Sequence, residues 1–111
     1  METQQLIQAT CPECRGPLTE AREEHLREYR CLVGHAYSPS SLLQAHSETQ
    51  ERALWAAVVA LEEAAKLVDA IAPQFPPEIA DRLQTQARIK SQQALEIREI
   101  IEELEPFHTG S

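Results

Sequence analysis

The sequence predicts a mostly α-helical chain in which a small β-hairpin module precedes a long antiparallel hairpin of two helices. The first observation behind this prediction is a set of cysteines and a histidine at metal-ligand spacing within residues 11–35. The second is the absence of Gly and Pro between Pro39 and Pro73, which permits an uninterrupted helix. The third is composition: 42% of the residues are hydrophobic but only 5% are aromatic, which favours helices with small-residue seams.

Four soft donors mark the first module. Cys11 and Cys14 are separated by two residues, and after a further 16 residues Cys31 and His35 are separated by three. This is the spacing of structural zinc sites, in which each pair of donors closes one tight loop, or knuckle. We therefore predict one bound zinc ion with a structural role, because four protein ligands leave no open coordination position. The alternatives are three ordinary buried cysteines beside a surface histidine, or a disulfide that leaves one thiol unpaired.

Residues 1–37 form the predicted zinc-binding module, which resembles a zinc ribbon in its spacing. Residues 17–30 are expected to form two short antiparallel strands around a charged tip at residues 22–24, because such a hairpin returns the second knuckle to the first. Residues 1–10 are a lead-in or a first edge of the module. The unit is too small to fold without its ion, and zinc binding contributes on the order of 10–16 kcal/mol in comparable peptides.

The helical hairpin is predicted over residues 38–106. Ser38 is the expected N-cap, and Pro39 suits the first helical position because its missing N–H has no partner there. Pro106 stops the second helix. The predicted parts are a helix at about 39–72, a loop at about 73–77, a helix at about 77–105 and a tail at 107–111.

Both helices carry apolar residues that alternate spacings of four and three. The predicted seam is Leu54, Val58, Leu61, Ala65, Val68 and Ala72 on the first helix, and Leu83, Ala87, Lys90, Ala94, Ile97, Ile101 and Leu104 on the second. Because the connection between the helices is short, they are expected to pack as antiparallel neighbours in the manner of a coiled coil.

Apolar residues beside this seam predict a partner surface. Trp55 and Val59 flank it on the first helix, and Ile89 and Ile100 flank it on the second. Exposed apolar surface of this kind usually marks an interaction site. Self-association into a dimer is the simplest use, and docking of a signalling protein is the other. The alternative is that Trp55 lies across the seam and closes a monomer.

Composition and missing motifs exclude several classes of function. The formal net charge of -8 argues against a nucleic-acid partner, although four arginines lie in the first module. No apolar run approaches the roughly 18 residues needed to cross a bilayer, and no signal-peptide pattern is present, so we expect a cytoplasmic protein. The sequence shows no Gly-rich phosphate loop and no activated serine, so we predict that the chain is not an enzyme.

The motifs then resemble those of a known bacterial family. They are Cys11-Pro12-Glu13-Cys14-Arg15-Gly16-Pro17-Leu18, Tyr29-Arg30-Cys31-Leu32-Val33-Gly34-His35-Ala36-Tyr37-Ser38 and Ala53-Leu54-Trp55-Ala56-Ala57. Together they are similar to the C-terminal extension of some chemotaxis-type protein-glutamate methylesterases. The resemblance implies an accessory module alone, because the esterase domain has no counterpart here, and it implies that Cys11, Cys14, Cys31 and His35 take the family's metal positions. Arg15 departs from the glycine usual at its position.

The first functional hypothesis is a non-catalytic, zinc-stabilised protein-interaction or adaptor module in bacterial chemotaxis-like signalling. The second is a thiol-based redox or metal sensor, in which oxidation of the cysteines ejects zinc. The third is a nucleic-acid-binding zinc ribbon, for which Arg15, Arg22, Arg27 and Arg30 would have to supply the positive charge.

Overall fold

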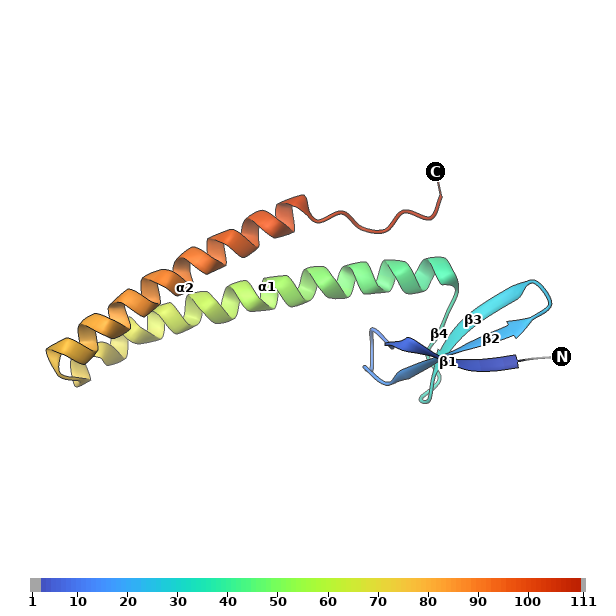
Figure 1. Ribbon diagram of the computed structural model, residues 1–111, viewed down its shortest axis with the longest axis horizontal. Coiled ribbons are helices and arrows are strands. Elements are labelled where there is room, and N and C mark those ends of the chain that lie inside the picture. The colour runs from blue at the N-terminus through green and yellow to red at the C-terminus, as the bar shows by residue number, and fades with distance from the viewer. Residues whose placement is uncertain (1–2, 111) are drawn as a thin grey trace. The chain divides into compact units, whose positions relative to one another are not determined.

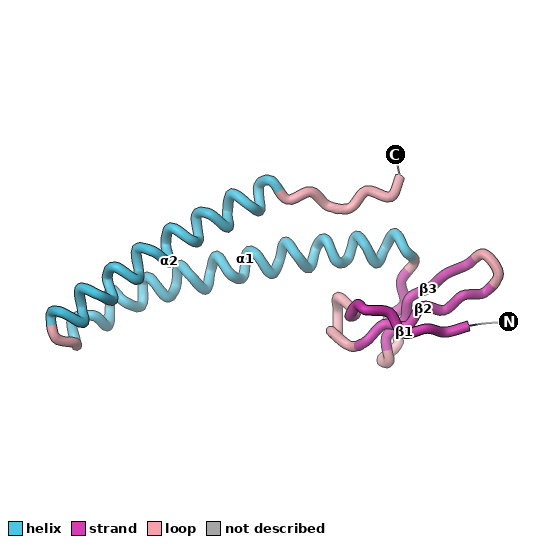
Figure 2. The backbone as a smooth tube through the Cα atoms, viewed as in Figure 1, coloured by secondary structure: helices cyan, strands magenta, loops and turns pink. Residues whose placement is uncertain are grey.

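The computed structural model describes residues 3–110 (Figure 1). Four strands come first: β1 (Thr3–Thr10), β2 (Pro17–Glu23), β3 (Leu26–Cys31) and β4 (Ala36–Tyr37). Two helices follow, α1 (Pro39–Ile71) and α2 (Pro77–Glu103), with the short 3-10 helix η1 (Ala72–Gln74) between them. A small β module followed by a helical hairpin is the predicted fold class, which is confirmed (Figure 2).

By their contacts the described residues form two compact units. The first runs up to Thr49 and takes in Pro106 and the residues after it, and the second is Gln50–Glu105. The division falls inside α1. The first turns of this helix therefore belong to the β unit, and the rest of the helix belongs to the hairpin.

The sheet of the first unit is antiparallel, with the strand order β1-β2-β3-β4. β2 and β3 remain paired as far as Glu23 and Leu26, so that only Glu24 and His25 form the turn. Glu24 takes the left-handed conformation, with φ 55°, that such a tight turn requires. The charged tip expected at residues 22–24 is thus displaced, because strand pairing continues to Glu23.

Two further strands complete the sheet. β1 pairs with β2 from Thr3 opposite Arg22 to Thr10 opposite Pro17, which makes it the edge of the module rather than a lead-in. β4 is only two residues long and pairs Tyr37 with Tyr29 of β3. β4 was not expected as a strand, because its hydrogen bonds go to a segment that only the fold brings beside it.

The core of the first unit is a small cluster of buried side chains. Its members are Cys11, Leu18, Cys31, Tyr37 and Leu42. Leu42 comes from the first turns of α1, so the start of this helix packs against the module. The same part of α1 also reaches β1, because Nε2 of His46 lies 3.0 Å from the carbonyl oxygen of Thr10.

The start of α1 is capped as the sequence predicts. The backbone N–H of Ser41 donates to Oγ of Ser38 over 3.1 Å, and the backbone N–H of Ser38 donates to Oγ of Ser41 over 2.9 Å. This reciprocal pair follows the logic of a capping box, with serine in place of the usual Glu or Gln. Pro39 occupies the first helical position.

The hairpin seam is built from small apolar side chains. Val58 is completely buried, and Ala72, Ala87 and Ala94 are almost so. Lys90, predicted in the seam, is exposed and lies beside Ile89 in a shallow surface hollow. A charged side chain stays in water unless the interior supplies a partner, and this explains its place.

The ends of the hairpin helices depart slightly from expectation. The break begins with a turn of 3-10 helix over Ala72–Gln74, because Pro73 suits the first positions of such a turn. α2 ends at Glu103, and Leu104 is already extended with ψ 123°. The residue before a proline avoids helical conformation, so Pro106 ends the helix upstream of Glu105.

The buried core of the first unit yields a stability prediction. Leu18 is fully buried, whereas Leu26 on the neighbouring strand is 76% exposed. Leu18→Ala should lower the free energy of unfolding of this unit by about 2–5 kcal/mol, because it leaves a cavity. Leu26→Ala should change it by less than about 0.5 kcal/mol. Urea denaturation followed through the amide NMR signals of residues 4–49 measures both, and equal losses would contradict the described core.

Candidate metal centre

The first knuckle follows β1. The backbone N–H of Cys11 donates to the carbonyl oxygen of Gly16, and that of Arg15 donates to the carbonyl oxygen of Cys11, both over 2.8 Å. These bonds fold the loop so that the side chains of Cys11 and Cys14 converge. Arg15 itself takes the left-handed conformation, with φ 65°, at the position where the sequence resemblance led us to expect glycine. The backbone therefore keeps the knuckle geometry at a modest cost in strain.

The second knuckle connects β3 to β4. Gly34 has φ 103°, a conformation that side chains rarely allow, so glycine is required there. The backbone N–H of Gly34 donates to the carbonyl oxygen of Cys31 over 3.3 Å, and that of Cys31 donates to the carbonyl oxygen of His35 over 3.1 Å. The backbone N–H of His35 in turn donates to Sγ of Cys31 over 3.3 Å. The loop thus presents one sulfur and one imidazole on the same side.

The two knuckles bring all four predicted ligands together. One ligand atom each from Cys11, Cys14, Cys31 and His35 lie within 4.8 Å of one another. None of the three cysteines forms a disulfide. Bonds of about 2.3 Å to a tetrahedral zinc ion place two sulfurs about 3.8 Å apart, which these separations allow. The cluster is therefore of the right size and chemistry to hold a metal ion.

The members of the cluster differ in their exposure to solvent. Cys11 and Cys31 are buried and form part of the core of the first unit. Cys14 is exposed, and His35 is half-buried. One side of the cluster thus faces the interior, and the other faces water.

The imidazole of His35 is oriented by contacts on both of its nitrogens. Nδ1 lies 3.3 Å from Sγ of Cys31 and 3.5 Å from Sγ of Cys11. Nε2 lies 2.8 Å from Oε2 of Glu13. Nδ1 is therefore the nitrogen that faces the sulfurs, and Nε2 faces outward.

The surroundings favour the thiolate form of Cys11, which is the form that binds metals. Burial raises the pKa of this thiol, but hydrogen bonds from Tyr37 and from the backbone of Cys14 and Glu13 outweigh burial and lower the pKa to about 6. Burial likewise raises the pKa of Tyr37, so its phenol stays protonated. It lies 3.4 Å from Sγ of Cys11 and can donate to the thiolate.

The pKa values of the other ligands are shifted by their neighbours. Burial raises the pKa of Cys31, but hydrogen bonds from the backbone of His35 and Val33 outweigh it, so the net pKa is lowered. A hydrogen bond from the backbone of Gly16 lowers the pKa of Cys14, but burial and the neighbouring sulfurs raise it overall. The hydrogen bond with Cys31 raises the pKa of His35. The thiol of Cys14 therefore resists ionisation as long as the other two sulfurs carry charge.

Sequence reasoning missed two residues that touch the cluster. Glu13 lies inside the first knuckle, and Tyr37 follows the second knuckle by two residues. Their closeness to the ligands in the sequence was the only feature that could have identified them. Closeness in the sequence does not show which ligand each side chain contacts, because that depends on how the knuckles face each other.

The four predicted partner residues do not lie on one face of the hairpin. Arg98 lies on the same side as Trp55, because its guanidinium carbon is 5.4 Å from the centre of the indole ring. Ile89 is nine residues from Arg98, and at about 100° per residue it points to the opposite side of α2. Ile100 also points away from Arg98. The hairpin thus has a tryptophan face, with Trp55, Leu95 and Arg98, and a second face that carries Ile89 and Ile100.

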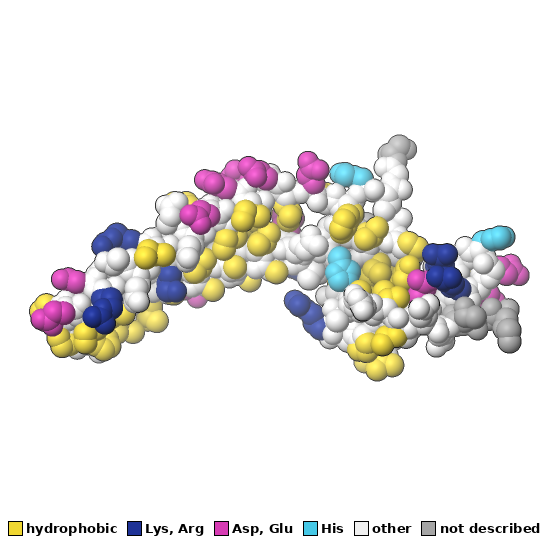
Figure 3. All heavy atoms as spheres, viewed as in Figure 1, with side chains coloured by type: hydrophobic (Ala, Val, Ile, Leu, Met, Phe, Trp, Pro, Cys, Tyr) yellow, Lys and Arg dark blue, Asp and Glu magenta, His cyan; other side chains and the backbone are white. Residues whose placement is uncertain are grey.

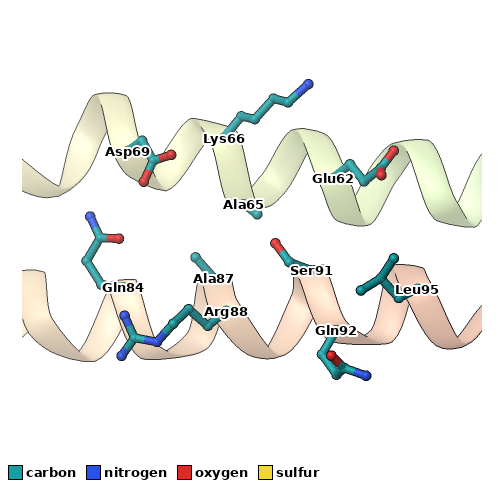
Figure 4. A pocket seen from close by; sticks show the side chains of 10 residues that line it. All are labelled: Glu62, Ala65, Lys66, Asp69, Gln84, Ala87, Arg88, Ser91, Gln92 and Leu95. Carbon is teal, nitrogen blue, oxygen red and sulfur yellow. The ribbon is translucent and has the colours of Figure 1, made fainter.

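The tryptophan face is largely polar. Arg98 donates to both carboxylate oxygens of Glu62 over 3.1 Å. Beside this pair, Ala65 and Ala87 point between the helices and leave a hollow of about 550 Å³, whereas Lys66 and Gln92 point away (Figure 4). Charged side chains of both signs are spread along this hollow, so it offers no convergent set of groups to one ligand.

Two further results bear on the class of protein. Within residues 3–110, no helix is both long enough and apolar enough to cross a membrane. Comparison with protein-family models, with curated proteins and with solved structures gives no significant match.

Proposed function

We propose that this chain is a non-catalytic protein-interaction module whose first unit is held together by one structural zinc ion. The convergence of three sulfurs and one imidazole nitrogen within 4.8 Å is the observation that carries the proposal. Soft thiolate donors with one imidazole favour zinc over magnesium or calcium, which prefer oxygen ligands. Four protein ligands close the coordination sphere, so the ion has no position for a substrate.

The small core explains why the unit needs a metal. Two of the five buried residues in its core cluster, Cys11 and Cys31, are themselves ligands. Apolar burial by the remaining residues is too limited to balance the conformational entropy lost on folding. Zinc would supply the missing stability, and through Leu42 it would also anchor the start of α1.

The zinc proposal predicts a metal content. The chain purified without added metal or chelator should carry one zinc ion, as measured by native mass spectrometry. His35→Gln should weaken zinc binding by more than the 10–100-fold typical of an outer-shell residue, because it removes a ligand. His25→Gln is the matched control, since His25 lies exposed in the β2–β3 turn. A zinc-free chain, or equal affinity in both variants, would refute the site.

The second face of the hairpin supports association with a second copy of the chain. Ala53, Ala57, Ala60 and Ala64 repeat the four–three spacing of the seam one residue away from it, and we call them, with Ile89 and Ile100, the alanine face. Ile89 is 53% exposed and Ile100 is 50% exposed. Hydrophobic side chains are exposed along the helices (Figure 3). Small residues at heptad spacing let another helix approach closely.

The size and charge of the alanine face make it a better candidate for the dimer interface than the tryptophan face. The α1 row of the alanine face contains no charged residue, although the whole chain has a net charge of -8 that would otherwise keep copies apart, and on α2 Glu96 lies at the same spacing between Ile89 and Ile100. The row on α1, continued by Leu67 and Ile71, spans roughly 27 Å, and two helices are about 20 Å wide. Two such faces would bury about 1,100 Å², near the lower end for a specific interface. A dimer with a four-helix bundle would result.

Substitutions on each face test which of the two forms the dimer interface. The double variant Ile89→Asp with Ile100→Asp should be monomeric by light scattering at about 100 μM, because it would bury two charges in the interface. Trp55→Asp should remain dimeric, and zinc content should be unchanged in both. The reverse pattern would assign the interface to Trp55 and Val59, and a monomeric wild-type chain would refute self-association.

The resemblance of the two knuckles and the Ala53–Ala57 segment to methylesterase extensions supports a role in bacterial chemotaxis-like signalling. We therefore propose a cytoplasmic accessory module that brings signalling chains together. Of the alternatives, nucleic-acid binding has the weakest support. Arg22 forms an ion pair with Glu20, and Arg30 forms one with Glu28, so acidic neighbours offset these positive charges.

Exposure of Cys14 favours a second candidate, a thiol redox sensor. Hydrogen peroxide could oxidise two ligand thiolates to a disulfide while it is reduced to two hydroxide ions, and the zinc ion would be released. Zinc release at a few equivalents of peroxide, followed with a colorimetric chelator, tests this function. A structural site should keep its zinc under these conditions, because coordination lowers the reactivity of the thiolates. Stoichiometric release within minutes would favour the sensor.

A further inference from the structure

The side chain of Glu13 bridges the two knuckles independently of any metal ion. Its Oε2 lies 2.8 Å from Nε2 of His35, although Glu13 belongs to the first knuckle and His35 to the second. A carboxylate can only accept a hydrogen bond at this position, so Nε2 must carry the proton. Zinc binds only a neutral imidazole, which has one proton, so with zinc bound Nδ1 is left with its lone pair toward the sulfurs.

We propose that Glu13 is a positioning residue that selects the Nε2–H tautomer of His35 and thereby makes Nδ1 the zinc-binding nitrogen. The inference rests on the proposed zinc site and adds to it the atom that binds and the residue that selects it. Carboxylates that accept a hydrogen bond from a ligand histidine fix the orientation of its ring and raise its basicity toward the metal. Glu13 has the same relation to His35.

The contact is too exposed to act as a stabilising ion pair. The side chain of Glu13 is 61% exposed and that of His35 is 36% exposed. Solvent screens such pairs, which typically contribute little to folding stability. Replacing Glu13 should therefore leave the fold intact and change the orientation of the imidazole, which allows a test of positioning alone.

Tyr37 supplies a contrast because it contacts a sulfur of the cluster, although its phenol also interacts with the side chain of Glu13. Its phenol lies 3.4 Å from Sγ of Cys11, is buried and touches no nitrogen of His35 in the described contacts. With zinc bound, three thiolates and a neutral imidazole leave one net negative charge, which a phenol donor stabilises. Tyr37→Phe should weaken zinc binding without altering the tautomer of His35. Glu13→Ala should weaken zinc binding and also alter the tautomer.

The experiment uses the zinc-loaded full chain labelled with nitrogen-15. Long-range proton–nitrogen spectra of His35 should show zinc at Nδ1 and a proton at Nε2 in the wild type. Glu13→Ala should lose this single pattern and weaken zinc binding 10–100-fold in competition with a chelator. Glu13→Gln should keep the pattern, because its amide oxygen also accepts from Nε2–H. Glu23→Ala, an exposed carboxylate at the end of β2, is the control and should match the wild type.

Three outcomes would overturn the inference in distinguishable ways. A wild-type spectrum with zinc at Nε2 would refute the tautomer assignment and leave the zinc site standing. Glu13→Ala with an unchanged spectrum and unchanged affinity would remove the role of Glu13 alone. A chain that binds no zinc would overturn the proposed function and this inference together.

Discussion

The convergence of Cys11, Cys14, Cys31 and His35 is the constraint on which the first unit depends. It joins the end of β1 to the loop between β3 and β4, and two of its members are also core residues. The ligand cluster and the hydrophobic core are thus one structure, in which Cys11 and Cys31 are buried with Leu18 and Leu42, whereas Cys14 is exposed. Only three residues lie between His35 and Pro39, so the position of the second knuckle also determines where α1 begins.

The hairpin follows a different physical logic. Its buried positions are mostly alanine, which lets the helices approach but buries little area per residue. A long, thin pair of helices consequently leaves much apolar surface uncovered, and the two sides of the pair differ. One side carries Trp55 beneath Arg98 and its ion pair with Glu62, and the other carries an uncharged row of small residues. The proposal that the hairpin binds a partner therefore depends on the exposed apolar surface along the two helices, and no single anchor residue carries it.

Two neighbouring side chains act on different ligands of the cluster. Tyr37 reaches Cys11 from the core, where burial keeps the phenol protonated and able to donate. Glu13 reaches His35 from solvent, where a charged carboxylate costs little. The phenol is therefore buried and the carboxylate exposed, as suits a neutral and a charged group. Tyr37 favours the thiolate form of Cys11, and Glu13 favours a single tautomer of His35.

The sequence by itself determined the four candidate ligands, the start of α1 at Ser38-Pro39, the break near Pro73 and most of the seam. These features depend on local spacing, on capping and on the missing N–H of proline, all of which involve residues that are close in the sequence. Only the tertiary structure decided that β1 and β4 join the sheet, that Arg15 bends the first knuckle and that Lys90 stays in water. It also decided which residues touch which ligand, and that Trp55 and Ile89 lie on different faces. Those outcomes depend on contacts between segments distant in the chain, because such contacts form only once the fold brings the partners together.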